Sequence, residues 1–126
     1  MGALLNWVTP SYARVLRQQF VQAAVEAGCS PDDLLPAGYV RVEVGTDAAD
    51  AMSKQIGFYP RLPFYREHWE AMGNPAGDEV AVISSHGEGL QEQLAAWDAL
   101  DVIVARIVPM TPHNVVRTVE ALLRPA

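Results

Sequence analysis

The sequence predicts an α/β protein in which parallel strands alternate with helices. Three short runs with strand character, at residues 3–8, 38–44 and 101–108, are each followed by a segment of helical periodicity. Parallel strands need a crossover connection, usually a helix, so this alternation is typical of a parallel sheet. A similar junction occurs twice, as LLNWVTP at residues 4–10 and RIVPMTP at residues 106–112. In both, a strand and a short loop lead to a Thr-Pro pair of the kind that begins helices.

The first half of the chain contains two of the strands. The apolar run 3–8 predicts a buried strand, and Thr9 is expected to cap a helix over residues 10–27, with Gly28 left-handed after its end. Residues 30–33 predict a turn or a single helical turn. The second strand, 38–44, alternates polar and valine positions, so one face is expected to tolerate polar groups and to point toward a barrel lumen or toward water. The apolar stripe of the first helix comprises Tyr12, Val15, Leu16, Phe20, Ala23, Ala24 and Ala27.

The second half predicts two helices, a short segment of ambiguous type, a capped helix, a strand and a last helix. The helices over 48–58 and 62–72 follow a cap at 45–47, and the second ends at the breaker cluster 73–77. Residues 79–83 are ambiguous. Ser84 or Ser85 is expected to cap a helix over 88–100, which places Leu90, Leu94, Trp97 and Leu100 on one face. The β-branched run 101–108 is the clearest strand, and Thr111-Pro112 begins a helix over 112–123.

Composition indicates a single globular domain over residues 1–126. Hydrophobic residues make up 50% and charged residues 19% of the chain, and the net charge is -6, which argues against non-specific nucleic-acid binding. No apolar run approaches the roughly 20 residues that cross a bilayer. The N-terminus has no basic segment, so we expect no secretory signal and a cytoplasmic protein. The lone Cys29 excludes an intrachain disulfide and a Cys-rich metal site.

Two segments contain candidate binding residues. Asn6 and Trp7 end the first strand, at the edge where α/β sheets bind ligands; alternatively, Trp7 packs on the helix and Asn6 caps the loop. The aromatic segment 58–66 carries Arg61 and Arg66, which are candidates for contacts with an anionic group in a substrate pocket. We favour a structural interpretation of this segment, as a sharp turn fixed by prolines and aromatic packing.

The sequence offers little support for a metal site or for a catalytic nucleophile. His68, His86 and His113 are widely spaced, and no pair has a metal-ligand spacing, so we expect no metal site. Residues 84–87 (SSHG) match neither a nucleophile elbow nor a phosphate-binding loop, and helix capping explains them better. Residue spacing alone therefore identifies no catalytic residues.

The sequence resembles the last third to half of the bacterial-luciferase-like oxidoreductases, and most closely the actinobacterial branch that uses the deazaflavin coenzyme F420 instead of FMN. The resemblance spans nearly the whole chain and is carried by residues 2–10 (GALLNWVTP), 39–42 (YVRV), 58–65 (FYPRLPFY) and the C-terminal strand. The serine-rich cap at 84–89 departs from the family's acidic cap, and the turn between Ala99 and Asp101 is shortened.

This resemblance implies the last three strands of a (β/α)8 barrel, that is, a partial TIM barrel whose earlier strands, which carry most cofactor contacts, are missing. It implies hydride transfer with FMN or F420 if a complete site is assembled, with Asn6 and Trp7 as cofactor-binding positions. The partner would be a second copy of the chain or a complementary half-barrel chain. The alternatives are a non-catalytic half-barrel that self-associates through its exposed strand edges, or a fragment of a larger enzyme.

Overall fold

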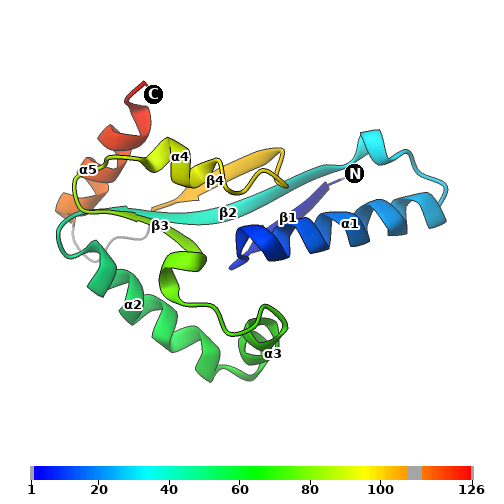
Figure 1. The fold of residues 1–126 in the computed structure, drawn as a ribbon, viewed down its shortest axis with the longest axis horizontal. Coiled ribbons are helices and arrows are strands. Elements are labelled where there is room, and N and C mark those ends of the chain that lie inside the picture. The colour runs from blue at the N-terminus through cyan, green and yellow to red at the C-terminus, as the bar shows by residue number, and fades with distance from the viewer. Residues whose placement is uncertain (1, 108–111, 126) are drawn as a thin grey trace.

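The computed structural model describes residues 2–107 and 112–125. Its described part contains a parallel sheet flanked by helices (Figure 1). The strands are β1 (Gly2–Asn6), β2 (Leu35–Val44), β3 (Ala81–Ser84) and β4 (Val102–Arg106). The helices are α1 (Pro10–Glu26), α2 (Ala48–Phe58), α3 (Pro63–Ala71), α4 (Leu90–Leu94) and α5 (Pro112–Leu123), with single 3-10 turns at Pro31–Asp33, Tyr59–Arg61 and Gly77–Glu79. The predicted alternation of parallel strands and helices is confirmed.

The strand β2 is the centre of the sheet. β1 pairs with its residues 35–39 and β4 with its residues 37–41, all in parallel. Since these two stretches overlap, β1 and β4 lie on opposite edges of β2. β3 pairs with the last part of β2, residues 41–44. The order β1-β2-β4 is the order of three consecutive strands in a barrel of βα units, and β3 extends pairing only at the carboxyl end.

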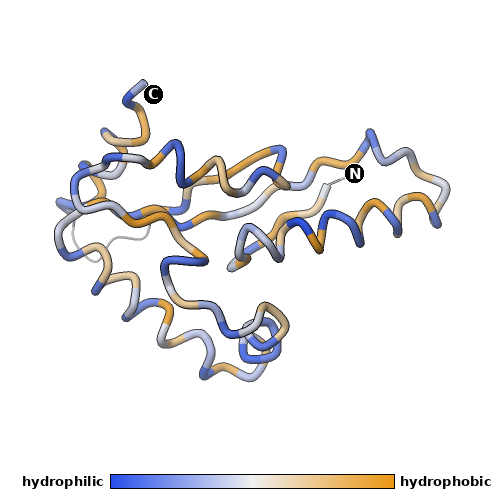
Figure 2. The backbone as a smooth tube through the Cα atoms, in the orientation of Figure 1, coloured by the Kyte–Doolittle hydropathy of each residue, from blue (hydrophilic) through white to orange (hydrophobic). Residues whose placement is uncertain are grey.

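The two faces of the sheet carry different side chains. Val40, Val42 and Val44 pack against α1, α4 and α5 through small and aliphatic residues such as Ala13, Leu90 and Ala121. In Figure 2 orange stretches of β2 are interrupted by white and blue ones, because its valines alternate with polar residues. The other face, which we call the inner face because it would line a barrel, carries Tyr39, Arg41 and Glu43 on β2. At the carboxyl end this face is covered by α2 and α3, where Met52, Ile56 and Trp69 form a second core with Trp7.

The first helix follows its prediction closely. Thr9 Oγ1 accepts a hydrogen bond from the Tyr12 N–H at 3.1 Å, and Gly28 has a φ of +76° after the helix end, so both expected caps are confirmed. The predicted buried stripe is only half right. Ala24 is buried, but Val15, Ala23 and Ala27 are exposed, because the sheet meets this helix over a narrower strip than the stripe requires.

Two strand boundaries differ from prediction. β1 ends at Asn6 instead of Val8, because Trp7 has a φ of +54° and cannot continue the strand. β2 begins at Leu35, three residues before the predicted start, because β1 and β4 supply partners along that stretch. The ambiguous segment 79–83 contributes a 3-10 turn and the start of β3. The predicted strand over 101–108 is observed over Val102–Arg106, with Val108 outside the described residues, as is Thr111 of the second predicted cap.

The predicted helix over 88–100 is wrong in length, since α4 spans only Leu90–Leu94. Arg14 and Arg17 donate to the carbonyl oxygens of Ala96 and Ala99, at 3.4 and 2.7 Å, and the Trp97 indole N–H donates to the Val8 carbonyl at 3.1 Å. These contacts hold the segment as turns against α1. Ser84 does not cap the helix either: its hydroxyl accepts from the Gly87 N–H at 2.9 Å and closes the preceding turn, while Gly89 takes the cap position.

Candidate functional site

Polar and aromatic side chains gather where β1, β2 and β4 end, on the inner face of the sheet. Asn6 is the last residue of β1, Arg41 lies in the carboxyl half of β2, and Arg106 is the last residue of β4. We call this group, with Trp7 and Tyr39, the carboxyl rim. In α/β sheets and barrels the carboxyl ends of strands are the usual place for ligands, because the βα loops start there.

Arg41 is the central residue of the carboxyl rim, and only 2% of it is exposed. Its guanidinium donates a hydrogen bond to Asn6 Oδ1 at 3.0 Å and lies over the Trp7 ring, 3.0 Å from the ring centroid. The side chain of Tyr59 also faces it, with the ring centroid at 5.7 Å. Burial, and then the positive charge of Arg106, lower the pKa of Arg41 to about 10, although its interaction with Tyr59 opposes this change.

Trp7 is fully buried, and its ring packs against the guanidinium of Arg41. Its ring packs against Tyr59 at 4.8 Å and against Trp69 at 5.6 Å between centroids. His68 on α3 forms a hydrogen bond of 2.5 Å with the Trp7 carbonyl. These contacts from distant segments hold Trp7 at its positive φ, a conformation that is rare for residues other than glycine and that concentrates at functional sites.

The predicted site residues separate into two groups. Asn6 and Trp7 lie together at the carboxyl rim, where Asn6 binds Arg41 and Trp7 is packed under it. Arg61 and Arg66 are exposed, on the turn before α3 and on α3 itself. In the same segment Tyr59 and Tyr65 pack around Trp7, while Phe58 and Phe64 are exposed. This packing agrees with the structural interpretation of residues 58–66.

Sequence reasoning missed the roles of Arg41, Arg106 and His68. The alternation along β2 did place Arg41 on a polar face, but it could not show that the side chain is buried. The pairing of Arg41 with Arg106 depends on the register of two strands far apart in the sequence. His68 contacts Trp7 through the tertiary packing of α3, for which the sequence contains no local signal.

A polar network lies beyond the carboxyl rim, at the end of β2, and joins the buried Glu43, Asn114 and Thr118 to the exposed Asp47. The Asn114 amide donates to Asp47 Oδ1 at 2.9 Å and to Glu43 Oε1 at 3.3 Å, and Thr118 Oγ1 accepts from the Val44 N–H at 3.0 Å. The hydrogen bond from Asn114 is the main reason that the pKa of Asp47 lies below its ordinary value. These contacts attach α5 to the sheet. Across the described residues, no three His, Cys, Asp or Glu side chains are grouped to hold a metal ion.

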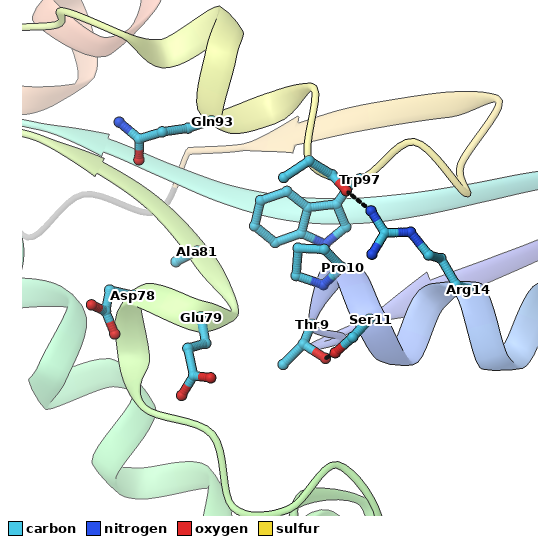
Figure 3. Close-up of a pocket in the computed structure, with 10 residues that line it drawn as sticks. Thr9, Pro10, Ser11, Arg14, Asp78, Glu79, Ala81, Gln93 and Trp97 are labelled. Carbon is cyan, nitrogen blue, oxygen red and sulfur yellow. Dashed lines mark hydrogen bonds between the residues drawn. The ribbon is translucent and has the colours of Figure 1, made fainter.

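A cavity of about 390 Å³ lies between the start of α1, the turn before β3 and the segment after α4 (Figure 3). The side chains of Thr9, Arg14 and Glu79 in its lining already have partners. Thr9 caps α1, Arg14 binds the Ala96 carbonyl and forms an ion pair of 2.9 Å with Asp98, and Glu79 accepts from the Ala76 N–H at 2.6 Å. We therefore assign this cavity a structural role and keep the carboxyl rim as the candidate site.

Comparisons with known proteins support the fold and leave the chemistry open. No family model and no curated protein matches this sequence. None of the helices in residues 2–107 and 112–125 has the length and hydropathy needed to cross a membrane. Among solved structures, an F420-dependent secondary alcohol dehydrogenase in complex with an F420-acetone adduct matches 96% of this chain with a TM-score of 0.65 and 14% sequence identity. The match covers 42% of that chain. The present chain is thus an α/β protein whose parallel βα units are arranged like part of a TIM barrel.

Proposed function

We propose that this chain is the part of an F420- or flavin-dependent oxidoreductase that contains the last three barrel strands. The observation that carries the proposal is the carboxyl rim, where Asn6, Arg41 and Arg106 from three neighbouring parallel strands meet at the edge that serves as the active site in such barrels. Likeness to an F420-dependent dehydrogenase favours the same chemistry. Activity would need further strands, from a second copy of the chain or from a complementary half-barrel.

The residues at the carboxyl rim fit the polar part of such a cofactor. Arg41 is a buried cation that forms no ion pair with the described residues, and the Trp7 indole N–H is buried without an acceptor among them. Oxygen atoms of a bound cofactor would satisfy such groups. When bound, FMN or F420 supplies the hydride acceptor, and the protein supplies position and exclusion of water. Of the two we favour F420, which is the cofactor of the structurally similar dehydrogenase.

Each residue would then have a separate task. Asn6 orients the Arg41 guanidinium through their hydrogen bond, and Arg41 contacts the cofactor. Trp7 has Arg41, Tyr59 and Trp69 against its ring, so it would position Arg41 instead of stacking on the cofactor. Arg61 and Arg66, both exposed near α3, are proposed for anionic groups of the substrate. We also propose that the protein is cytoplasmic.

A second candidate function is a non-catalytic half-barrel that self-associates. The burial of Trp7 and Arg41, at 0% and 2% exposure, favours it, because the chain's own α2 and α3 fill part of the space over the carboxyl rim. The exposed apolar residues of the inner face, such as Leu4 and Leu35 at 56% and 53%, would then serve assembly only.

Equilibrium binding of oxidised F420 and of FMN, followed by fluorescence, separates the two candidates. Saturable binding of either cofactor, lost in Arg41→Met, supports the oxidoreductase and identifies its cofactor. The variant Arg61→Gln tests the substrate residues separately, since it should leave cofactor affinity unchanged. If a folded, assembled sample binds neither cofactor, the oxidoreductase proposal is wrong and the non-catalytic half-barrel stands.

A further inference from the structure

Two arginines from adjacent strands lie side by side on the inner face. Arg41 of β2 and Arg106 of β4 are partners in the parallel register, and partnered residues point to the same face of a sheet. Two cations so placed repel each other. Within the part of the chain that the structure describes, neither one forms an ion pair with a carboxylate, since the ion pairs found there are made by Arg14 and Arg17.

The guanidinium of Arg41 is fixed before any ligand arrives. Asn6 accepts its hydrogen bond, Trp7 lies against one side of it, and the side chain is almost completely buried. A buried charge without a counter-charge is unfavourable, and the low local dielectric that makes it so also strengthens its attraction for an anion. The arrangement therefore favours an anionic ligand at this position.

The approach to this pair is from the side of Arg106. Arg106 is exposed and lies 5.8 Å from the Tyr39 ring centroid, and Val104, the preceding residue on the same face of β4, is 40% exposed. An anion can thus reach Arg106 from solvent, where the positive charge of the buried Arg41 also attracts it. The buried Trp7 N–H, without an acceptor in the described residues, adds a further donor to the same cluster.

We propose that Arg41 and Arg106 form a binding site for an oxyanion, a phosphate or carboxylate group carried by a ligand over the carboxyl rim. Guanidinium groups suit this task because their fork of N–H donors matches two oxygens at once. The inference rests on the proposed function only for the place where the ligand lies; it needs no hydride chemistry. The oxyanion belongs either to the cofactor or to the substrate.

The three tryptophan indole N–H groups make the test internally controlled. Trp69 Nε1 already donates to the Pro75 carbonyl and Trp97 Nε1 to the Val8 carbonyl, whereas Trp7 Nε1 has no acceptor in the described residues. We would titrate inorganic phosphate at constant ionic strength and follow the indole signals by ¹⁵N NMR, assigned with Trp7→Phe. The expected result is a saturable shift of the Trp7 signal with small changes in the other two. Equal drift of all three signals, without saturation, overturns the site.

Two charge-removing variants locate the anion. Arg106→Gln should weaken phosphate binding at least tenfold, because it removes one of the two cations, while Arg106→Lys should retain part of the affinity. The matched control is Arg124→Gln, which removes an exposed arginine near Arg117 and His86 after α5. Unchanged Trp69 and Trp97 signals confirm that each variant is folded. An effect of Arg124→Gln as large as that of Arg106→Gln would contradict the proposal.

Cofactor titrations separate this inference from the proposed function and identify the source of the oxyanion. Phosphate binding that depends on Arg106, in a chain that binds neither F420 nor FMN, supports the oxyanion site and rejects the oxidoreductase. F420 binding of equal strength in the parent chain and in Arg106→Gln, together with phosphate binding that Arg106→Gln leaves unchanged, supports the oxidoreductase and rejects the oxyanion site. If FMN binds more tightly than riboflavin and Arg106→Gln removes that difference, the oxyanion is the cofactor phosphate. If phosphate and bound cofactor do not compete, it belongs to the substrate.

Discussion

At the end of β1, Trp7 has a backbone conformation that contacts from distant segments must maintain. Its φ of +54° costs on the order of 1–3 kcal/mol for a residue other than glycine. The Trp7 carbonyl is bound by His68, and its ring is packed against Arg41, Tyr59 and Trp69. The position of Asn6, one residue earlier, and hence of the Arg41 guanidinium, depends on these contacts.

His68→Phe should destabilise the chain through this backbone contact. The variant keeps an aromatic ring beside Tyr12, which lies 5.9 Å from the His68 ring, but it removes the hydrogen bond to the Trp7 carbonyl. We expect a loss of about 1–3 kcal/mol in the free energy of unfolding, the cost of an unsatisfied buried acceptor. Urea denaturation measures it. His113→Phe, at an exposed position of α5, is the control, and an equal effect of the two variants would contradict the expected role of His68.

How much of the site the sequence could predict differs from residue to residue. Asn6 and Trp7 were predictable because they directly follow an apolar run and precede a helix cap, a local pattern. The oxyanion site was not, because it depends on which residue of β4 pairs with Arg41, and strand register is fixed by tertiary packing. The burial of Arg41 likewise comes from α2 and α3 covering the inner face, which alternation along β2 cannot reveal.

At the scale of elements, helices whose limits are set by local signals were predicted well. α1 and α5 have the predicted start at proline, and α5 has both predicted limits. α4 is much shorter than predicted, and the segment after it is held by Arg14 and Arg17 of another helix. Arg14 binds the Ala96 carbonyl, which a helix to residue 100 would pair with the Leu100 N–H, and Arg17 binds the Ala99 carbonyl. Amphipathic spacing still identified the buried residues of that segment correctly, since Leu90, Trp97 and Leu100 all pack inward.

The junction of β2, α2 and α5 predicts a dependence on pH. Asp47 has its pKa lowered mainly by the hydrogen bond from Asn114, so the folded state favours the carboxylate. A carboxylate of this kind contributes stability above the ordinary aspartate pKa of about 3.9, and this contribution is lost as the pH falls through the lower pKa of the folded state. Protonation would weaken the attachment of α5 to the end of β2.

Asn114→Ala should raise the pKa of Asp47 toward its ordinary value, because the hydrogen bond to that carboxylate is lost. It should also cost about 1–3 kcal/mol at neutral pH, because the buried hydrogen bond to Glu43 is lost. A ¹³C carboxyl titration by NMR gives the pKa, and urea denaturation gives the stability. The control is Gln18→Ala, which removes an exposed side-chain amide on α1. An unchanged Asp47 pKa in Asn114→Ala would show that this hydrogen bond does not set it.

The whole molecule exposes apolar surface where a closed barrel would bury it. On the inner face Leu4, Leu35, Val102 and Val104 are between 40% and 56% exposed. α5 buries polar residues, Asn114 and Thr118, against the sheet, while its outward side carries Val116 and Leu123 at 56% and 79% exposure. Apolar side chains gathered on a face in this way are typical of interfaces. Both the oxidoreductase and the non-catalytic half-barrel therefore predict that the chain associates with itself or with further strands.

Light scattering coupled to size-exclusion chromatography tests this surface. We expect the average mass of the purified chain to rise with concentration, and the double variant Val116→Lys/Val119→Lys to lower that mass, because it places charge in the apolar stripe of α5. The thermal stability should change little, since substitutions at exposed positions usually alter it by no more than about 0.5 kcal/mol. Phe64→Lys, at an 80% exposed residue of α3, is the matched control and should leave the mass unchanged. A parent chain that stays monomeric at every concentration would show that open sheet edges and an exposed inner face are tolerated without a partner. It would contradict the expectation that further strands must close the barrel.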